Sequence, residues 1–227
     1  HSLAVKALKF NYFPVKNIRK NDSLKIEIFG KKLPNPIGIA AGFDKNAEVY
    51  NSLFKLGFGF VEVGTVTPIK QYGNPKPRIF RLEEDEALIN RLGFNNSGSK
   101  NISSRIKSDL PNGFLGVNIG PNKDTKNRIE DYLICLRAFH DLTDYLTINI
   151  SSPNTENLRS FHDAKELSEL LDAIEIEKKK LNSSVPIAVK ISPDIEVNNI
   201  DNISELLIKY KIYLAIISNT TDKNREN

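Results

Sequence analysis

Six short apolar runs, each ending in polar residues and separated by segments of helical character, dominate the chain from Pro36 onward. The runs cover residues 36–41, 60–66, 114–120, 145–150, 186–191 and 213–218. Between them, residues 46–56, 97–110, 125–142, 163–182 and 198–210 carry apolar side chains at helical spacing. A strand that is apolar along its whole length is buried on both faces, as in parallel sheets covered by helices. The alternation therefore predicts an α/β fold, either a doubly wound open sheet or a (β/α) barrel.

The polar residues that end the runs favour the barrel. They are glycines, hydroxyls, amides, lysines and one aspartate, and they occupy positions 42, 44, 45, 64, 65, 67 and 118, the segment 149–155, positions 190 and 192, and the segment 218–221. A barrel collects all of its strand ends around one pocket, whereas an open sheet binds its ligand at a switch point. We therefore predict a (β/α)8 TIM-type barrel, of which this chain supplies about six of the eight βα units. Because the 227-residue chain starts at His1 and contains no methionine, we expect it to be part of a longer polypeptide.

Three segments lie outside this alternation. Residues 1–13 have the pattern of an amphipathic helix, which predicts a packing helix or one that touches a membrane surface. Residues 24–33 alternate apolar and polar around Phe29-Gly30 and predict a hairpin. The insertion at residues 67–94 is rich in proline and glycine and predicts a second hairpin, with strands at 78–82 and 87–91.

Composition excludes several classes of protein. The net charge of +4 arises from lysines and arginines scattered among acidic residues, so we expect no nucleic-acid partner. With one cysteine, Cys135, and three histidines without ligand-like spacing, we expect no metal site. No apolar run approaches the roughly 18 residues of a membrane span.

The stretch Thr147 to Arg159, TINISSPNTENLR, carries the densest polar cluster at a predicted strand end. Pro153 lacks a backbone N–H, so the strand must stop there. The asparagines around the predicted pocket offer paired donors and acceptors, which suit a flat heterocycle with carbonyl and N–H edges. Lys45 and Lys190 add positive charge for a carboxylate, a phosphate or an electron-rich ring.

These residues leave three functions open. In the first, an organic cofactor carries hydride chemistry while the protein orients the reactants. In the second, Lys190 forms a Schiff base as in a lysine aldolase. The third is a ligand-binding barrel without catalysis. No carboxylate pair or Ser-His-Asp set is available for glycosidase or classical hydrolase chemistry.

Eight motifs together resemble the dihydroorotate dehydrogenase family. They are AAGFDKN at 40–46, EVGTVTP at 62–68, GNPKPRIFRL at 73–82, INRLGFNN at 89–96, GVNIGPNKD at 116–124, NISSPNT at 149–155, VKISPD at 189–194 and SNTT at 218–221. The resemblance is to the class 2, quinone-reducing branch, because Ser152 stands where soluble members carry cysteine. A related flavin barrel acting on another dihydropyrimidine is the alternative, but that relative also carries cysteine at this position.

The resemblance implies an FMN-binding barrel that oxidises (S)-dihydroorotate to orotate in pyrimidine biosynthesis and passes electrons to a membrane quinone. Residues 1–23 are then the remnant of an N-terminal helical membrane-docking segment, and residues 24–227 form the barrel, incomplete at its C-terminal end. We expect a monomer with peripheral attachment to a membrane, on the cytoplasmic side of the inner membrane in a bacterium.

The resemblance also implies roles for individual residues. Ser152 is the expected catalytic base, with Thr155 in the proton relay. The expected substrate-binding residues are Lys45, Asn90, Arg91, Leu92, Gly93, Phe94, Asn149, Asn154, Asn219 and Thr220. The expected FMN-binding residues are Ala40, Ala41, Gly42, Thr65, Asn118, Asn149, Lys190 and Ser218.

Overall fold

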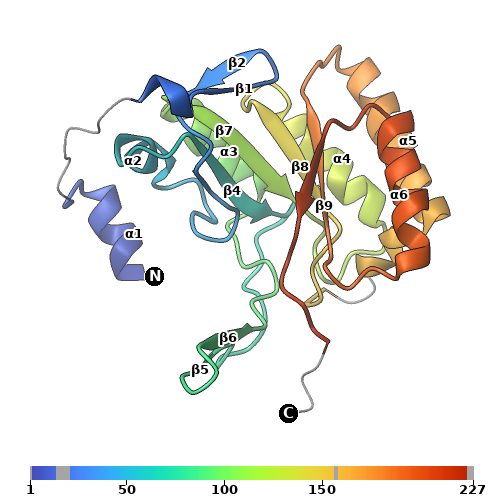
Figure 1. Ribbon diagram of the computed structural model, residues 1–227, viewed down its shortest axis with the longest axis horizontal. Helices are drawn as coiled ribbons and strands as arrows, with labels where there is room; N and C mark the ends of the chain where they lie inside the picture. The colour runs from blue at the N-terminus through green and yellow to red at the C-terminus, as the bar shows by residue number, and fades with distance from the viewer. Residues whose placement is uncertain (1, 14–20, 156–157, 224–227) are drawn as a thin grey trace.

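The main sheet of the protein has six parallel strands whose order in space follows their order in the chain. The computed structural model describes residues 2–13, 21–155 and 158–223. The strands are β3 (Gly38–Ile39), β4 (Phe60–Val66), β7 (Phe114–Ile119), β8 (Tyr145–Asn149), β9 (Ile187–Ile191) and β10 (Leu214–Ile217). Each unit adds its strand on the same side, whereas the order of a doubly wound sheet reverses. The sheet is therefore the curled part of a (β/α) barrel, and the predicted fold class is confirmed (Figure 1).

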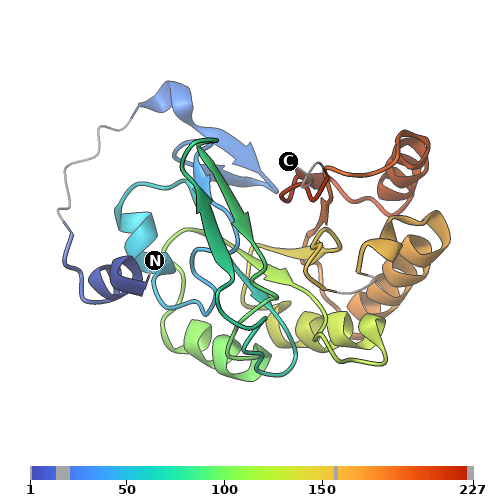
Figure 2. The ribbon, with the colours of Figure 1, turned by 90° about the horizontal axis from the view of Figure 1, so that it is seen from below.

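Five helices cover the outer face of this curl (Figures 1 and 2). They are α2 (Tyr50–Lys55), α3 (Ser99–Ser108), α4 (Arg128–Phe139), α5 (Ala164–Lys180) and α6 (Val197–Lys209). Outward residues of the central strands, such as Val63, Val117 and Ile148, are fully buried against them. This layer between sheet and helices is the main hydrophobic core.

Local hydrogen bonds explain why several helices begin later than predicted. The Asp44 carboxylate accepts the backbone N–H groups of Glu48 and Val49, so residues 46–49 form a loop and α2 begins at Tyr50. Asn127 accepts the N–H of Glu130 and caps α4. Asp163 caps α5 in the same way. Before it, the short 3-10 helix η2 (Leu158–His162) was not predicted.

The inner face of the sheet changes character along each strand, because alternate residues of a strand point to the same side. At the amino ends, Phe114, Tyr145 and Ala188 form an apolar cluster. The predicted hairpin closes this end as β1 (Ile26–Ile28) and β2 (Lys31–Leu33), preceded by the 3-10 helix η1 (Asp22–Leu24), and Leu33 joins the cluster. At the carboxyl ends the inward side chains are polar, which leaves that end for a ligand.

The second hairpin is also present, as β5 (Ile79–Leu82) and β6 (Ala87–Asn90). It projects from the body as a two-stranded ribbon (Figures 1 and 2). The N-terminal helix α1 (Ser2–Lys9) lies beside α2, where the Ser52 hydroxyl donates to the Leu8 carbonyl at 2.9 Å. Residues 14–20 lie outside the described ranges, so the expected boundary between residues 1–23 and 24–227 stays a prediction.

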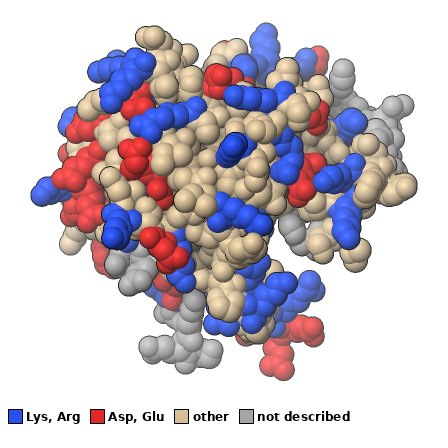
Figure 3. All heavy atoms as spheres, turned by 180° about the vertical axis from the view of Figure 1, so that it is seen from behind, with Lys and Arg blue, Asp and Glu red and all other residues tan. Residues whose placement is uncertain are grey.

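The face shown in Figure 3 carries lysines and arginines interspersed with acidic residues. No helix within the described ranges is both long and apolar enough to cross a bilayer.

Candidate active site

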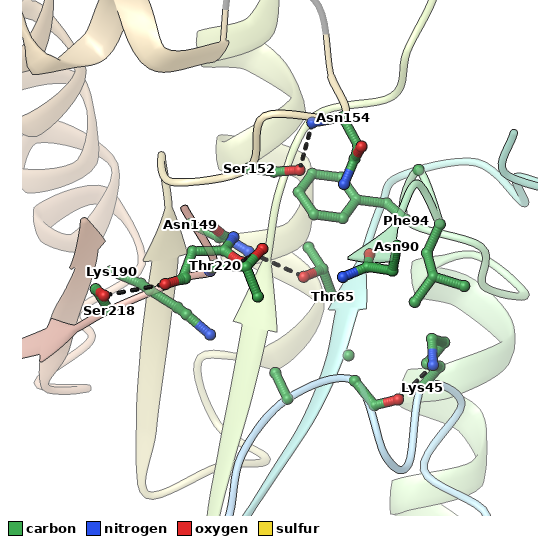
Figure 4. A pocket seen from close by; sticks show the side chains of 16 residues that line it. Lys45, Thr65, Asn90, Phe94, Asn149, Ser152, Asn154, Lys190, Ser218 and Thr220 are labelled. Carbon is green, nitrogen blue, oxygen red and sulfur yellow. Dashed lines mark hydrogen bonds between the residues drawn. The ribbon is translucent and has the colours of Figure 1, made fainter. Parts of the chain in front are cut away.

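The carboxyl ends of the strands surround a pocket of about 370 Å³. The residues that line it are Ala41, Gly42, Lys45, Gly64, Thr65, Asn90, Leu92, Gly93, Phe94, Asn149, Ser152, Asn154, Lys190, Ser218, Asn219 and Thr220. All of these except Gly64 are site residues expected from the sequence. Figure 4 shows Lys190 and Ser218 on one side of the pocket and Asn90 and Phe94 on the other. Loops from distant parts of the chain therefore meet here, as the barrel topology requires.

The other four expected site residues, Ala40, Arg91, Asn118 and Thr155, are not among the lining residues. Asn118 is fully buried one layer beneath the pocket, and Thr155 is buried at the end of the loop that follows β8. Arg91 lies at the base of the β5–β6 hairpin, where its guanidinium donates to the Pro77 carbonyl and lies over the Phe80 ring. The structure thus brings Asn118 into indirect contact with the pocket and directs Arg91 elsewhere.

A hydrogen-bonded triad forms the floor of the pocket. The Thr65 hydroxyl donates to Asn118 Oδ1 at 2.6 Å, and Asn149 Nδ2 donates to Asn118 Oδ1 at 3.1 Å and to Thr65 Oγ1 at 3.0 Å. All three residues are buried. Their mutual bonds fix the side chains before a ligand arrives, which reduces the entropy lost on binding.

The loop after β8 positions Ser152. The backbone N–H of Asn154 donates to Ser152 Oγ at 3.2 Å (Figure 4). Its neighbour Ser151 donates to Asn149 Oδ1 at 2.7 Å and accepts from Asn219 Nδ2 at 3.0 Å. The loop is therefore tied both to the floor triad and to the segment that follows β10.

Two lysines reach the pocket from opposite sides. Burial, and secondarily the charge of Arg78, lowers the pKa of Lys45, whose ammonium donates to the Gly42 carbonyl. Lys190 extends from β9, and its ammonium has no hydrogen bond or ion pair with any residue that the structure describes. Both cations therefore face a cavity in which a bound anion would find little competition.

Bare backbone forms another wall of the pocket. Gly42 has a φ of +110°, and a Cβ there would meet no atom within 4 Å, so a side chain would extend into open space. Gly64 has a φ of +109°, and a Cβ would lie 2.4 Å from the Asn118 carbonyl oxygen. Glycine lets a planar ligand approach the backbone closely at such positions. Together with the amides and lysines, this wall suits a flat heterocycle with carbonyl and N–H edges.

Arg159 is a site residue that the sequence did not reveal. It donates to the carbonyls of Ser151 at 3.1 Å and Thr220 at 3.4 Å, and it pairs with Asp194 at 3.1 Å and Asp222 at 2.5 Å. Burial opposes the charge on Asp194, but hydrogen bonds from Thr221 and Asp222 and the charge of Arg159 hold its pKa below the usual range. Arg159 thus links the loops that follow β8, β9 and β10 through its guanidinium group.

Glu62 is the second such residue. It lies on the inner face of β4, beneath the floor triad, and its carboxylate accepts a hydrogen bond from Asn118 Nδ2 at 2.9 Å. The available signal was a charged residue inside an otherwise apolar run, FVEVGTV. No group of three His, Cys, Asp or Glu side chains that could hold a metal occurs within residues 2–13, 21–155 and 158–223.

Comparison with known proteins shows which family has this sequence and this fold. Residues 23–226 match the family model described as dihydroorotate dehydrogenase. The chain is 46% identical to the dihydroorotate dehydrogenase (quinone) of Agrobacterium fabrum, over 97% of this chain and 62% of that protein. It is 49% identical to the protein of the same name from Novosphingobium aromaticivorans, over 97% of this chain and 64% of that one. The chain therefore spans less than two thirds of the length of these curated relatives.

Solved structures give the same result for the fold. A crystal structure of DHODH from Eimeria tenella in complex with ferulenol superimposes with a TM-score of 0.93 at 36% identity, over 100% of this chain and 67% of that one. A ligand-free structure of DHODH from the same organism has the same TM-score and identity and is covered to 70%.

Proposed function

This chain belongs to the dihydroorotate dehydrogenase family, and on that premise we propose that the whole protein oxidises (S)-dihydroorotate to orotate, with FMN as hydride acceptor and a membrane quinone as final electron acceptor. The reaction belongs to pyrimidine biosynthesis. The observation that carries the proposal is the convergence of Ser152, Lys45, Lys190 and four pocket asparagines on one cavity at the carboxyl end of a parallel barrel. The names of the curated relatives do not favour an aldolase or another dihydropyrimidine substrate.

The donor set of the pocket supports FMN as the cofactor. The backbone at Gly42, the small side chain of Ala41, the amide floor and the cation of Lys190 match the flat ring and polar edges of a flavin. We propose that Ala40, Ala41, Gly42, Thr65, Asn149, Lys190 and Ser218 hold the ring, with Asn118 acting from beneath. FMN supplies hydride-accepting chemistry when it is bound.

We propose that Ser152 is the general base. Its oxygen already accepts the N–H of Asn154, which leaves the hydroxyl proton free to be passed on as the oxygen takes the proton from C5 of dihydroorotate. A serine hydroxyl is a weak base, so its own proton needs an outlet, and the buried Thr155 is the proposed next group. Both residues belong to the loop that is tied to Asn149 and Asn219.

The remaining polar groups are proposed to hold the substrate. Lys45 is suited to its carboxylate, and Asn90, Asn149, Asn154, Asn219 and Thr220 are suited to the carbonyl and N–H edges of its ring. Leu92, Gly93 and Phe94 give that side of the pocket an apolar wall, while Arg91 is proposed to brace the hairpin that carries them.

The membrane contact is proposed to involve α1. Its Leu3 is 81% exposed and the nearby Phe10 is 64% exposed, and Lys6 and Lys9 stand on the same segment. Exposed apolar side chains beside lysines suit the interface of an anionic membrane. We also propose that the complete protein works as a monomer on that surface.

One experiment tests the proposed reaction. The complete protein should purify with bound flavin, and dihydroorotate should bleach the flavin in the absence of oxygen and yield orotate when a quinone is added. Borohydride in the presence of substrate should leave Lys190 unlabelled. A colourless protein in which borohydride traps substrate on Lys190 would instead support the aldolase.

A further inference from the structure

Glu62 is buried in the barrel interior beneath the pocket, with only 3% of its surface exposed. Its two carboxylate oxygens have different partners. Oε1 accepts from Asn118 Nδ2 at 2.9 Å, while Oε2 accepts from the Tyr145 hydroxyl at 2.9 Å and the Thr147 hydroxyl at 2.7 Å. Glycine at position 116 makes this possible, because a Cβ there would lie 2.2 Å from Cζ of Tyr145.

A carboxylate that accepts on both oxygens fixes the direction of its neighbours. Asn118 must turn its NH₂ group toward Glu62 and its oxygen toward the pocket. That oxygen accepts from Thr65 and from Asn149 Nδ2, so Asn149 must turn its own oxygen toward Ser151. Each amide is thus oriented by the one below it.

The same direction continues across the pocket. Because Ser151 donates its only hydroxyl hydrogen to Asn149, it can only accept from Asn219 Nδ2. Asn219 then presents its oxygen to the backbone N–H of Thr220, at 2.7 Å. In this series of hydrogen bonds, each side chain above Glu62 donates toward the barrel interior and accepts from the residue above it. The series extends from Glu62 to the loop after β10 and includes residues that we propose bind the ligands.

We propose that Glu62 is a positioning residue that sets the direction of this amide ladder, defined as Asn118, Asn149, Ser151 and Asn219. Because Asn118 presents its oxygen to Thr65, the Thr65 hydroxyl donates its only hydrogen to Asn118. Toward the pocket, the Thr65 oxygen can therefore act only as a hydrogen-bond acceptor. A ligand group that meets Thr65 must therefore be a donor, such as a ring N–H. The identity of the ligands rests on the proposed function, but the direction of the ladder does not.

A swap of donor and acceptor tests the proposal in the complete, flavin-loaded protein. Asn118→Asp places two carboxylates in contact and should weaken orotate binding about tenfold, which corresponds to about 1.4 kcal/mol. Adding Glu62→Gln restores one donor, the glutamine NH₂ group, and one acceptor, an aspartate oxygen, between positions 62 and 118. The other aspartate oxygen at position 118 can still accept from Thr65 and Asn149. The double variant should recover orotate affinity to within about threefold of the parent.

Thr147→Val is the matched control. It removes a hydrogen bond to the same carboxylate but leaves the contact with Asn118 in place, so orotate affinity should stay within about threefold of the parent. A folded Asn118→Asp variant with parental affinity, or a folded double variant without recovery, would overturn the proposal.

The side-chain amide signals of Asn149 and Asn219, observed by NMR after isotopic labelling of asparagine, give a readout that needs no substrate. They should move in Asn118→Asp, return toward the parental positions in the double variant, and stay in place in Thr147→Val. Glu62→Leu, which leaves the Asn118 NH₂ group without its acceptor, should move the same signals, and unmoved signals in folded Glu62→Leu would overturn the proposal even if Asn118→Asp fails to fold. Absence of orotate binding by the parent protein would count against the proposed function only, since the amide signals still test the ladder.

Discussion

The two ends of the sheet are built from the same six strands but have opposite chemistry. On β8, for example, Tyr145 belongs to the apolar cluster at the amino end, whereas Asn149, four residues later on the same face, belongs to the floor of the pocket. The amino end is closed by Leu33 of the β1–β2 hairpin. The carboxyl end is open and lined by amides and lysines.

Stability and chemistry are therefore located at opposite ends of the same strands. Apolar contact at the amino end contributes to the free energy of folding, and the loops at the carboxyl end add polar groups without disturbing that contact. Substitutions at the two ends should therefore change different measured quantities.

The largest effect is expected from Ser152→Ala at the carboxyl end. Removing the proposed base should slow flavin reduction by dihydroorotate about 10²–10⁴-fold, because general-base catalysis is worth that much. The hydroxyl makes one hydrogen bond to the Asn154 N–H within the described structure, so flavin content and melting temperature should change little. Anaerobic stopped-flow mixing would measure the rate, and an unchanged rate would remove Ser152 from its role.

Leu33→Ala at the amino end should have the reverse effect. The side chain is 2% exposed, and truncating a buried leucine costs about 2–5 kcal/mol of unfolding free energy. Chemical denaturation would measure this loss, with Leu24→Ala as the control because Leu24 is 48% exposed. Flavin reduction in the folded protein should be unaffected, and a slow rate at parental stability would contradict the separation of the two ends.

A smaller effect is expected at His162, between the pocket loops and the helices. Burial, with a further contribution from the charge of Arg159, lowers the pKa of His162 to about 4, and its Nε2 accepts the Ser192 N–H at 3.3 Å. Between pH 6.5 and pH 4 the unfolded chain binds a proton that the folded chain does not, so stability should fall by roughly 2–3 kcal/mol as the pH decreases through this window.

His162→Gln is the matched variant for testing this pH dependence of stability. Its side-chain oxygen can accept the same N–H without titrating. Denaturation midpoints followed over this pH range should show a weaker dependence in His162→Gln than in the parent. Equal slopes in the two proteins would assign the acid sensitivity to other groups.

The sequence predicted much of this arrangement because parallel strands bring their ends together. Lys45, Ser152 and Lys190 are far apart in the chain, but each follows or ends an apolar run, and the structure gathers all three around one pocket. The hairpin at residues 24–33 was predicted from alternating residues, and the second hairpin was predicted within the insertion rich in proline and glycine. Periodicity and turn residues were sufficient for these features.

Two residues were missed for different physical reasons. Glu62 belongs to a run that predicts a strand buried on both faces, but the inner face of this strand carries its own polar layer. Arg159 has partners 35 and 63 residues away, at Asp194 and Asp222, and such pairs leave no local pattern. Sequence periodicity therefore cannot predict the part of the site that depends on polar contacts between residues far apart in the chain.

The smallest effect is expected from Arg159→Lys, which tests whether the contacts of the Arg159 guanidinium position the loops at the carboxyl end of the sheet. Lysine keeps the charge but loses the planar set of donors that reaches Ser151, Asp194 and Asp222 together. The KM for dihydroorotate should rise up to about tenfold, because the loops that carry Ser152 and Asn219 would be less well fixed.

Arg137→Lys is the control for that prediction, because Arg137 also pairs with two carboxylates, Glu130 and Glu177, but on the outer helices. It should leave the KM unchanged while altering stability by an amount similar to Arg159→Lys. If both substitutions raised the KM equally, or neither did, Arg159 would have no specific role in positioning the loops at the carboxyl end.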